Sequence, residues 1–124
     1  MSEGCRCGDA PKLIFSCSGA ADVGGVADLA ARKLTREGKG QMFCLAGIGG
    51  EVPGIMQTTA GAAGILAIDG CPVDCTKKSL LRAGFTGMEH LQLADLGLEK
   101  GSSPATAENV DKVCVRAAGM LAEM

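Results

Sequence analysis

The sequence contains no tryptophan and no tyrosine, and only three phenylalanines among its 124 residues. Base stacking on aromatic side chains, a common way of holding single-stranded nucleic acid, is therefore disfavoured. Twelve basic against fourteen acidic residues give a net charge of -2, so the chain also lacks the basic surface that nucleic-acid binding requires. We expect the partner to be a protein or a small molecule, with no nucleic acid involved.

Long apolar runs are absent as well. The longest stretch without a charged residue lies between Glu51 and Asp69, and it contains Gln57, two threonines and three glycines. This stretch is too polar to span a bilayer. The first residues lack the apolar core of a signal peptide, so we expect a cytoplasmic protein without a membrane anchor.

Glycine is abundant, with 19 residues in 124, whereas an ordinary protein has about 7%. Hydrophobic residues still make up 47% of the chain, which is typical of a globular protein. The length suits one domain. The first nine residues are polar and contain glycine. We therefore predict a flexible lead-in over residues 1–10 and a single domain over residues 11–124.

Short apolar runs and helical spacings alternate along the domain. The runs predict strands over residues 12–17, 41–46, 65–68 and 90–94, the last with the alternation of an edge strand. The helical pattern predicts helices that end before Gly38, span residues 72–83, and begin at Pro104. A short helix over residues 55–59 is predicted only from connection length, because a parallel crossover needs about a dozen residues. This order predicts an α/β three-layer sandwich with a four-stranded, mainly parallel sheet and Rossmann-like or flavodoxin-like βα repeats. A ferredoxin-like α+β plait is the alternative, but it needs hairpins where this chain has crossovers.

Four cysteines fall where predicted strands end. Cys17 ends the first strand, Cys44 lies near the end of the second, and Cys71 and Cys75 follow the third. The carboxyl ends of parallel strands line a crevice that is the usual ligand site of such sheets. With Pro72 as the first helical residue, Cys71 caps the helix and Cys75 lies one turn later, where the helix N-terminus favours thiolate.

A shared site of four thiolates has the ligand set of a tetrahedral zinc ion. Such a centre carries a net charge of -2, which backbone N–H groups of glycine-rich turns can compensate. We therefore predict zinc as the cofactor and Cys17, Cys44, Cys71 and Cys75 as its ligands. The glycines predicted to contact the bound group are Gly19, Gly47, Gly49 and Gly70.

Other chemically interesting side chains have ordinary structural explanations. Cys114 lies on the apolar stripe of the last helix, and His90 is predicted to be a surface histidine rather than the partner of a nucleophile. Asp69 is predicted to accept N–H groups within its own turn, and Asp74 to complement the start of a helix.

Three segments together resemble the DGC-domain family, which is named for its central Asp-Gly-Cys. They are Ser16-Cys17-Ser18-Gly19, Cys44-Leu45-Ala46-Gly47-Ile48-Gly49 and Ile68-Asp69-Gly70-Cys71-Pro72-Val73-Asp74-Cys75, and Asp95-Leu96-Gly97 downstream adds to the likeness. The resemblance runs from residue 12 to the end of the chain. It implies zinc chelation by the same four cysteines and defines no biochemical activity. Cys5 and Cys7 lie outside the pattern.

Two classes of function remain open, and the sequence does not decide whether the protein is an enzyme. The first is a zinc-binding protein whose metal has a structural or sensory role, because four thiolates leave no open coordination position. The second is a thiol-based redox enzyme or sulfur carrier, with Cys71 or Cys17 as nucleophile and Cys75 as the resolving thiol. An iron-sulfur cluster or copper(I) could occupy the same soft ligands.

Overall fold

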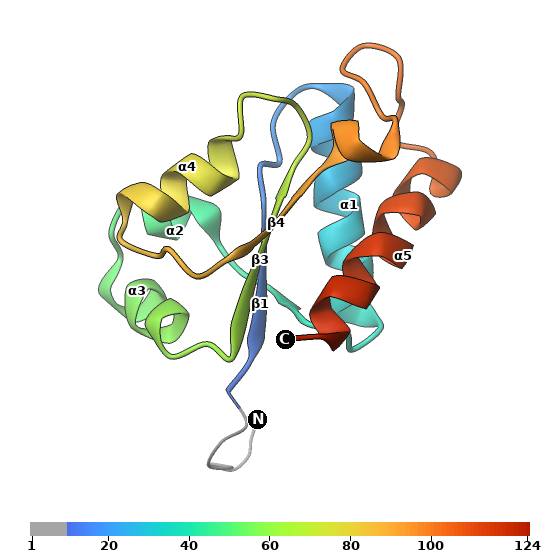
Figure 1. Ribbon diagram of the computed structural model, residues 1–124. Helices are drawn as coiled ribbons and strands as arrows, with labels where there is room; N and C mark the ends of the chain where they lie inside the picture. The colour runs from blue at the N-terminus through green and yellow to red at the C-terminus, as the bar shows by residue number, and fades with distance from the viewer. Residues whose placement is uncertain (1–9) are drawn as a thin grey trace.

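A computed structural model describes residues 10–124 (Figure 1). The strands are β1 (Lys12–Ser16), β2 (Gln41–Met42), β3 (Gly64–Asp69) and β4 (Glu89–Gln92). The helices are α1 (Asp22–Arg36), α2 (Leu45–Gly49), α3 (Pro53–Ala60), α4 (Cys75–Arg82) and α5 (Ala107–Ala122), with a 3₁₀ turn η1 (Leu93–Leu96). All strands are parallel in the order β2-β1-β3-β4, which confirms the predicted α/β fold. None of the helices described here is long and apolar enough to cross a membrane.

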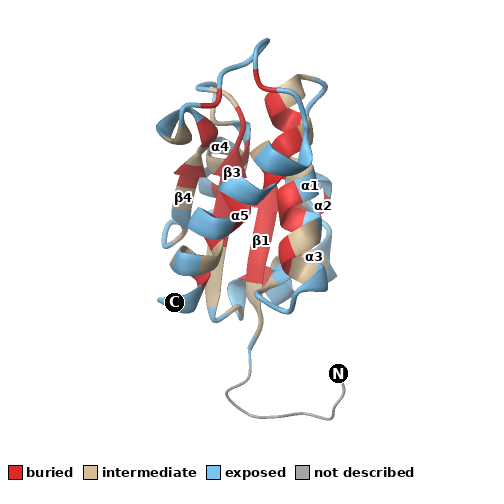
Figure 2. Ribbon diagram, turned by 90° about the vertical axis from the view of Figure 1, so that its right-hand side faces the viewer, coloured by how far each residue is buried: buried red, intermediate tan, exposed pale blue. Residues whose placement is uncertain are grey.

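Helices cover both faces of the sheet. Leu13 and Phe15 of β1 belong to a core cluster with Ile48 of α2 and Leu80 of α4, whereas Ile14 belongs to a second cluster with residues of α1 and α5. Figure 1 shows α2, α3 and α4 on one side of the sheet and α1 and α5 on the other, and Figure 2 shows the buried strands between them. The arrangement is compatible with the predicted three layers.

The strand order creates a switch point between β1 and β3. From β1 the chain passes through α1 to β2 at one side, and it then returns through α2 and α3 to β3 on the other side of β1. A uniform crossover hand places these connections on opposite faces of the sheet. The loops after β1 and β3 therefore diverge, and such a divergence is where open parallel sheets bind their ligands.

Helix α4 begins three residues later than predicted. Its first residue is Cys75, and Asp74, with a left-handed φ of 60°, precedes it as the N-cap. The buried carboxylate of Asp69 accepts the backbone N–H groups of Thr76 and Lys77, which fixes the helix start. Cys71 therefore lies in the loop before the helix, and the prediction that it caps the helix is wrong.

The second predicted strand and the last predicted helix also have other bounds in the structure. Strand β2 ends at Met42, and Cys44 caps a short helix where the sequence predicted more strand. The last helix begins at Ala107, after Pro104, because the Thr106 hydroxyl accepts the backbone N–H of Asn109 and supplies the cap.

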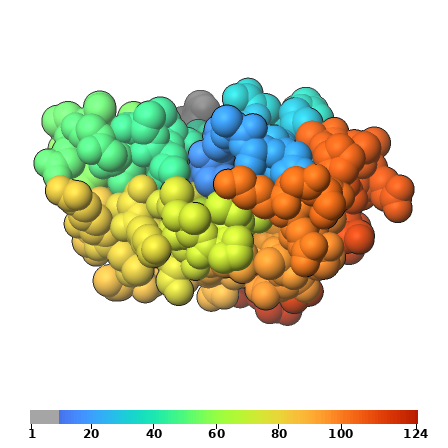
Figure 3. All heavy atoms as spheres, turned by 90° about the horizontal axis from the view of Figure 1, so that it is seen from above, coloured from blue at the N-terminus to red at the C-terminus, as the bar shows by residue number. Residues whose placement is uncertain are grey.

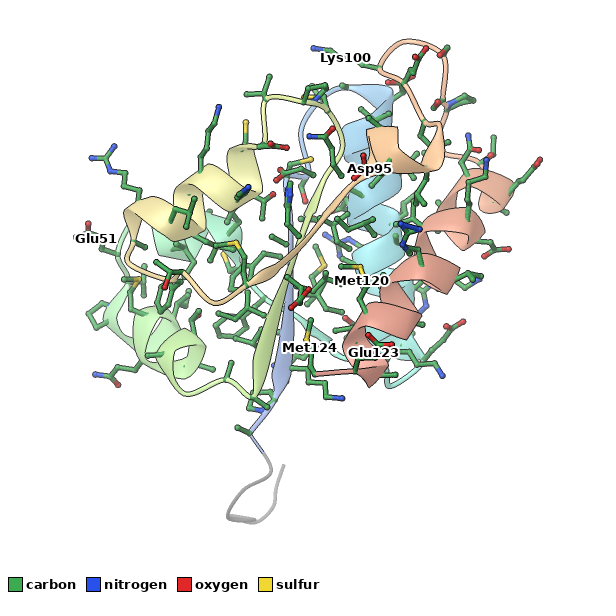
Figure 4. The ribbon with its side chains drawn as sticks, viewed as in Figure 1. Glu51, Asp95, Lys100, Met120, Glu123 and Met124 are labelled. Carbon is green, nitrogen blue, oxygen red and sulfur yellow. The ribbon has the colours of Figure 1, made fainter. Side chains whose placement is uncertain are left out.

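Asp22, the first residue of α1, anchors the loop before α5. Its carboxylate accepts the backbone N–H groups of Gly101 at 2.9 and 3.0 Å, Ser103 at 3.1 Å and Val23 at 2.8 Å. Figure 4 shows Lys100 in this loop, pointing away from the body of the protein. The bond from Gly101, followed by those from Ser103 and Val23, lowers the pKa of Asp22 below its ordinary value of 3.8 despite some desolvation.

Asp22→Asn is expected to destabilise the protein at neutral pH and to lose that effect in acid. A lowered folded-state pKa stabilises the fold fully above 3.8, and the contribution disappears as pH falls through the lower folded value. Urea midpoints of the wild type and the variant, measured from neutral pH to below pH 3.8, should converge. The exposed Asp95→Asn is the control, and a pH-independent gap between wild type and Asp22→Asn would contradict the argument.

Candidate functional site

The loops after β1 and β3 meet on the face that carries the carboxyl ends of the strands. Viewed from above, the segments that follow β1 (blue) and β3 (yellow-green) lie side by side at the centre of this face (Figure 3). Residues near α2 (green) flank them on one side, and the loop between η1 and α5 (orange) flanks them on the other. The predicted edge is therefore assembled from four separate parts of the chain.

Cys17 lies at the switch point between β1 and β3. Its side chain is partly buried, and its Sγ atom accepts the backbone N–H of Gly70 at 3.4 Å. Cys71 is also partly buried, and both cysteines pack against the core cluster beneath α1. The fold thus brings the first cysteine next to the Asp-Gly-Cys segment, 53 residues further along the chain.

Cys44 lies on the wall of an open hollow. It is exposed and caps α2, where its Sγ accepts the backbone N–H of Gly47 at 3.3 Å. The hollow is also lined by Cys17, Ser18 and Arg32. Cys44 is therefore not a core-filling residue, and it shares a concave surface with Cys17.

Cys75 is exposed at the first position of α4, directly after the loop that contains Cys71. Within residues 10–124, no three of the cysteine sulfurs lie within 4.8 Å of one another. The four-sulfur site stays a prediction, and its formation requires the sulfurs to move closer together. Cys5 and Cys7 lie outside the described residues.

Close packing explains why glycine is present at two of the four positions that were predicted to contact the bound group. A Cβ on Gly70 would lie 2.7 Å from the backbone of Val23, and one on Gly47 would lie 2.1 Å from Cδ1 of Ile55. Gly19 and Gly49 face open space, with no atom within 4 Å of a Cβ. Their contact with a bound group stays a prediction.

A second group of polar residues lies beside the cysteine loop. The side chain of Asp69 at the end of β3 is only 1% exposed. Its Oδ1 accepts the N–H of Thr76 at 2.8 Å, and its Oδ2 accepts the N–H of Lys77 at 3.1 Å. Asp69 was predicted to accept N–H groups within its own turn. It accepts them instead from the first turn of α4.

His90 completes this group from the neighbouring strand. Its Nε2 atom lies 2.9 Å from Oδ2 of Asp69 and 3.6 Å from Oδ1 of Asp74, and Gln92 donates a 2.6 Å hydrogen bond to the same Asp74 oxygen. The histidine side chain is 20% exposed, so the prediction of a surface histidine is wrong. Among residues 10–124, Asp69, Asp74 and His90 form the one group of three or more metal-binding side chains with donor atoms within 4.8 Å.

This group was missed because its members lie on different elements. The available signal was the alternation of His90 and Gln92, which places both side chains on one face of β4. Gln92 is in register with Asp69 of β3, and this pairing becomes visible only with the strand order.

A polar chain lines the hollow next to Cys17. The Ser16 and Ser18 hydroxyls lie 2.6 Å apart, and Ser18 donates to Asp28 at 2.7 Å, as does Arg32. Partial burial alone would raise the pKa of Asp28, but the bonds from Arg32 and Ser18 and the Arg32 charge lower it overall. Asp28 therefore holds Arg32 on the wall of the hollow.

Cys114 has the structural role that the sequence predicts. Its side chain is buried on α5, and its thiol lies 3.6 Å from the carbonyl oxygen of Ala30 in α1. Burial raises the pKa of this thiol, which makes it a poor nucleophile at neutral pH.

Comparison with known proteins identifies the family. The sequence model of the DGC domain family matches residues 13–117 of the chain. The chain belongs to the DGC domain family. This DGC protein is 39% identical over 88 residues to the "Anaerobic and virulence modulator AnvM" of Pseudomonas aeruginosa, and the match covers 71% of this chain and 67% of that protein. No solved structure matches the chain significantly.

Proposed function

We propose that this DGC domain protein binds zinc through Cys17, Cys44, Cys71 and Cys75 in a sensory or structural role. The observation that carries the proposal is that these cysteines come from three loops at one edge of a parallel sheet. Two of those loops diverge at the switch point between β1 and β3, the usual ligand position of the architecture.

The donor chemistry of this edge supports the proposal. Thiolates are preferred ligands of zinc, and a four-thiolate centre needs its negative charge offset. Gly70 and Gly47 already donate backbone N–H groups to the sulfurs of Cys17 and Cys44. Hydrogen bonds of this kind stabilise a ligating thiolate and hold it in position.

The spacing of the sulfurs favours the sensory role. Because no three of the described sulfurs lie within 4.8 Å of one another, zinc binding has to bring the cysteines that follow β1, β2 and β3 closer together. Binding that selects a closed arrangement shifts the population of loop conformations, which a partner can detect. A regulatory role agrees with the name of the relative, a modulator.

Cys71→Ser is expected to abolish near-stoichiometric zinc binding. A hydroxyl is a far weaker zinc ligand than a thiolate, so we expect affinity to fall by at least about tenfold. Zinc, iron and copper per chain are measured in protein purified without added metal. Cys114→Ser is the matched control, since its thiol is buried in the core away from the edge.

X-ray absorption at the zinc edge counts the sulfur ligands directly. Four sulfurs, lost in part in Cys71→Ser, support the proposal. Equal zinc in both proteins, or a wild type without metal, contradicts it. Iron or copper in place of zinc assigns the same ligands to an iron-sulfur or copper(I) site.

A thiol enzyme or sulfur carrier is the second candidate, and the exposure of Cys44 and Cys75 favours it. This hypothesis predicts a metal-free protein in which one thiol alkylates rapidly at neutral pH. Mass spectrometry of briefly alkylated protein identifies that residue. Cys114 serves as the internal reference for a slow thiol, because burial raises its pKa.

A further inference from the structure

We propose that Asp69, Asp74 and His90 form a second metal site, which takes a divalent first-row transition metal on oxygen and nitrogen ligands. The site uses none of the cysteines, and the proposal stands independently of the zinc site on the sulfurs. It rests on three donor atoms contributed by the end of β3, the N-cap of α4 and the strand β4.

The distances suit a shared ion. Metals of this class bind carboxylate oxygen and imidazole nitrogen at about 2.0–2.2 Å, so neighbouring ligands lie about 3.0 Å apart at right angles and about 3.4 Å apart in a tetrahedron. Nε2 of His90 lies 2.9 Å from Oδ2 of Asp69 and 3.6 Å from Oδ1 of Asp74. All three atoms lie within 4.8 Å of one another, so little rearrangement is needed to accept the ion.

The surroundings hold the ligands in place. The backbone N–H groups of Thr76 and Lys77 fix the carboxylate of Asp69, and Gln92 fixes that of Asp74. Metal sites depend on such supporting hydrogen bonds to orient their ligands. A carboxylate offers about four acceptor positions, and Asp69 uses two for the helix, so it keeps capacity for an ion.

Binding of the metal ion replaces the hydrogen bond between His90 and Asp69. In the structure the short contact between His90 and Asp69 is a hydrogen bond. A metal ligand must be a neutral imidazole with a free lone pair on Nε2. A neutral His90 that carries its proton on Nε2 therefore takes the tautomer protonated on Nδ1, whereas a protonated His90 releases the Nε2 proton to solvent. Only the N–H bond at Nε2 is broken.

The donor set also predicts which ions bind. One imidazole nitrogen and two carboxylate oxygens suit zinc, cobalt(II) or manganese(II), whereas copper(I) prefers sulfur. Three protein ligands leave at least one position for water or for an oxygen-bearing ligand. The second site is therefore open, unlike a closed four-sulfur centre.

Titration of the full chain with cobalt(II) distinguishes the two sites. Cobalt on thiolates gives an intense sulfur-to-metal charge-transfer band, whereas cobalt on oxygen and nitrogen gives only ligand-field bands. In a Cys71→Ser/Cys75→Ser variant we expect the ligand-field spectrum to persist. His90→Gln in that background should weaken cobalt binding by at least about tenfold. Glutamine can still donate to Asp69, and Asp74→Asn, which keeps the acceptor for Gln92, provides a second variant.

Each result decides one proposal. The second-site proposal is wrong if neither His90→Gln nor Asp74→Asn changes the cobalt affinity while urea midpoints show that both variants are folded. The same holds for a double-cysteine variant that binds no cobalt. The sulfur-to-metal band of the wild-type cysteines tests the zinc proposal separately, so the failure of one site leaves the other standing.

Discussion

Asp69→Ala is expected to destabilise the protein by about 3 kcal/mol or more. The substitution leaves the N–H of Thr76 buried without an acceptor and removes the partners of Lys77 and His90. The side chain is 1% exposed, so water cannot readily replace the carboxylate. Urea unfolding measured by circular dichroism gives the change in unfolding free energy.

Two variants separate the contributions to this effect. His90→Gln removes the imidazole but leaves both helix N–H groups paired, so its cost should be well below that of Asp69→Ala. Asp95→Asn, on the exposed surface of η1 (Figure 4), should stay within about 0.5 kcal/mol of the wild type. A loss below about 1 kcal/mol in Asp69→Ala would show that the start of α4 does not depend on this carboxylate.

The fold followed from the sequence because its central elements have clear periodic patterns. The apolar run from Leu13 to Phe15 is typical of a strand buried on both faces, and Val26, Ala30 and Leu34 form a buried stripe along α1. Local signals of this kind need no knowledge of neighbouring elements. Four strands separated by crossover lengths then left a parallel sheet as the simplest arrangement.

The element boundaries failed where a side-chain hydrogen bond to the first turn of a helix decides them. Pro72 is a favourable first helical residue, but the carboxylate of Asp69 binds the N–H groups of Thr76 and Lys77 and places the helix start at Cys75. In the same way, Cys44 caps α2 through its own sulfur, a role that its apolar surroundings in the sequence conceal.

The candidate site was predictable only in part, because contacts between separate elements assemble it. The strand ends placed Cys17 and Cys71 at one edge, and the structure brings the Cys17 sulfur to the N–H of Gly70. The pairing of Asp69 with His90 depends on β4 lying beside β3, and no local pattern specifies which strands are neighbours.

Gly70→Ala is expected to destabilise the protein by about 1–3 kcal/mol and to displace the Asp-Gly-Cys loop. Its Cβ would lie 2.7 Å from the carbonyl carbon and oxygen of Val23 and 3.0 Å from the nitrogen of Gly24. These atoms belong to the backbone of the first turn of α1, which cannot rotate away as a side chain can. The loop must therefore shift, and the N–H of Gly70 then moves away from the Cys17 sulfur.

Gly19→Ala is the matched control for this effect. Gly19 lies on the same edge of the sheet, but a Cβ there has no atom within 4 Å, so its urea midpoint should stay near that of the wild type. Zinc binding by Gly70→Ala adds a second measurement, because displacement of Gly70 also moves Cys71 next to it. Its control is Gly87→Ala, which lies outside the predicted site and whose Cβ also has no atom within 4 Å. Weaker zinc binding in Gly70→Ala with wild-type binding in Gly87→Ala would show that close packing against α1 positions the cysteine loop. Equal stability of Gly70→Ala and Gly19→Ala would show that the loop yields without cost and that packing does not explain the glycine at position 70.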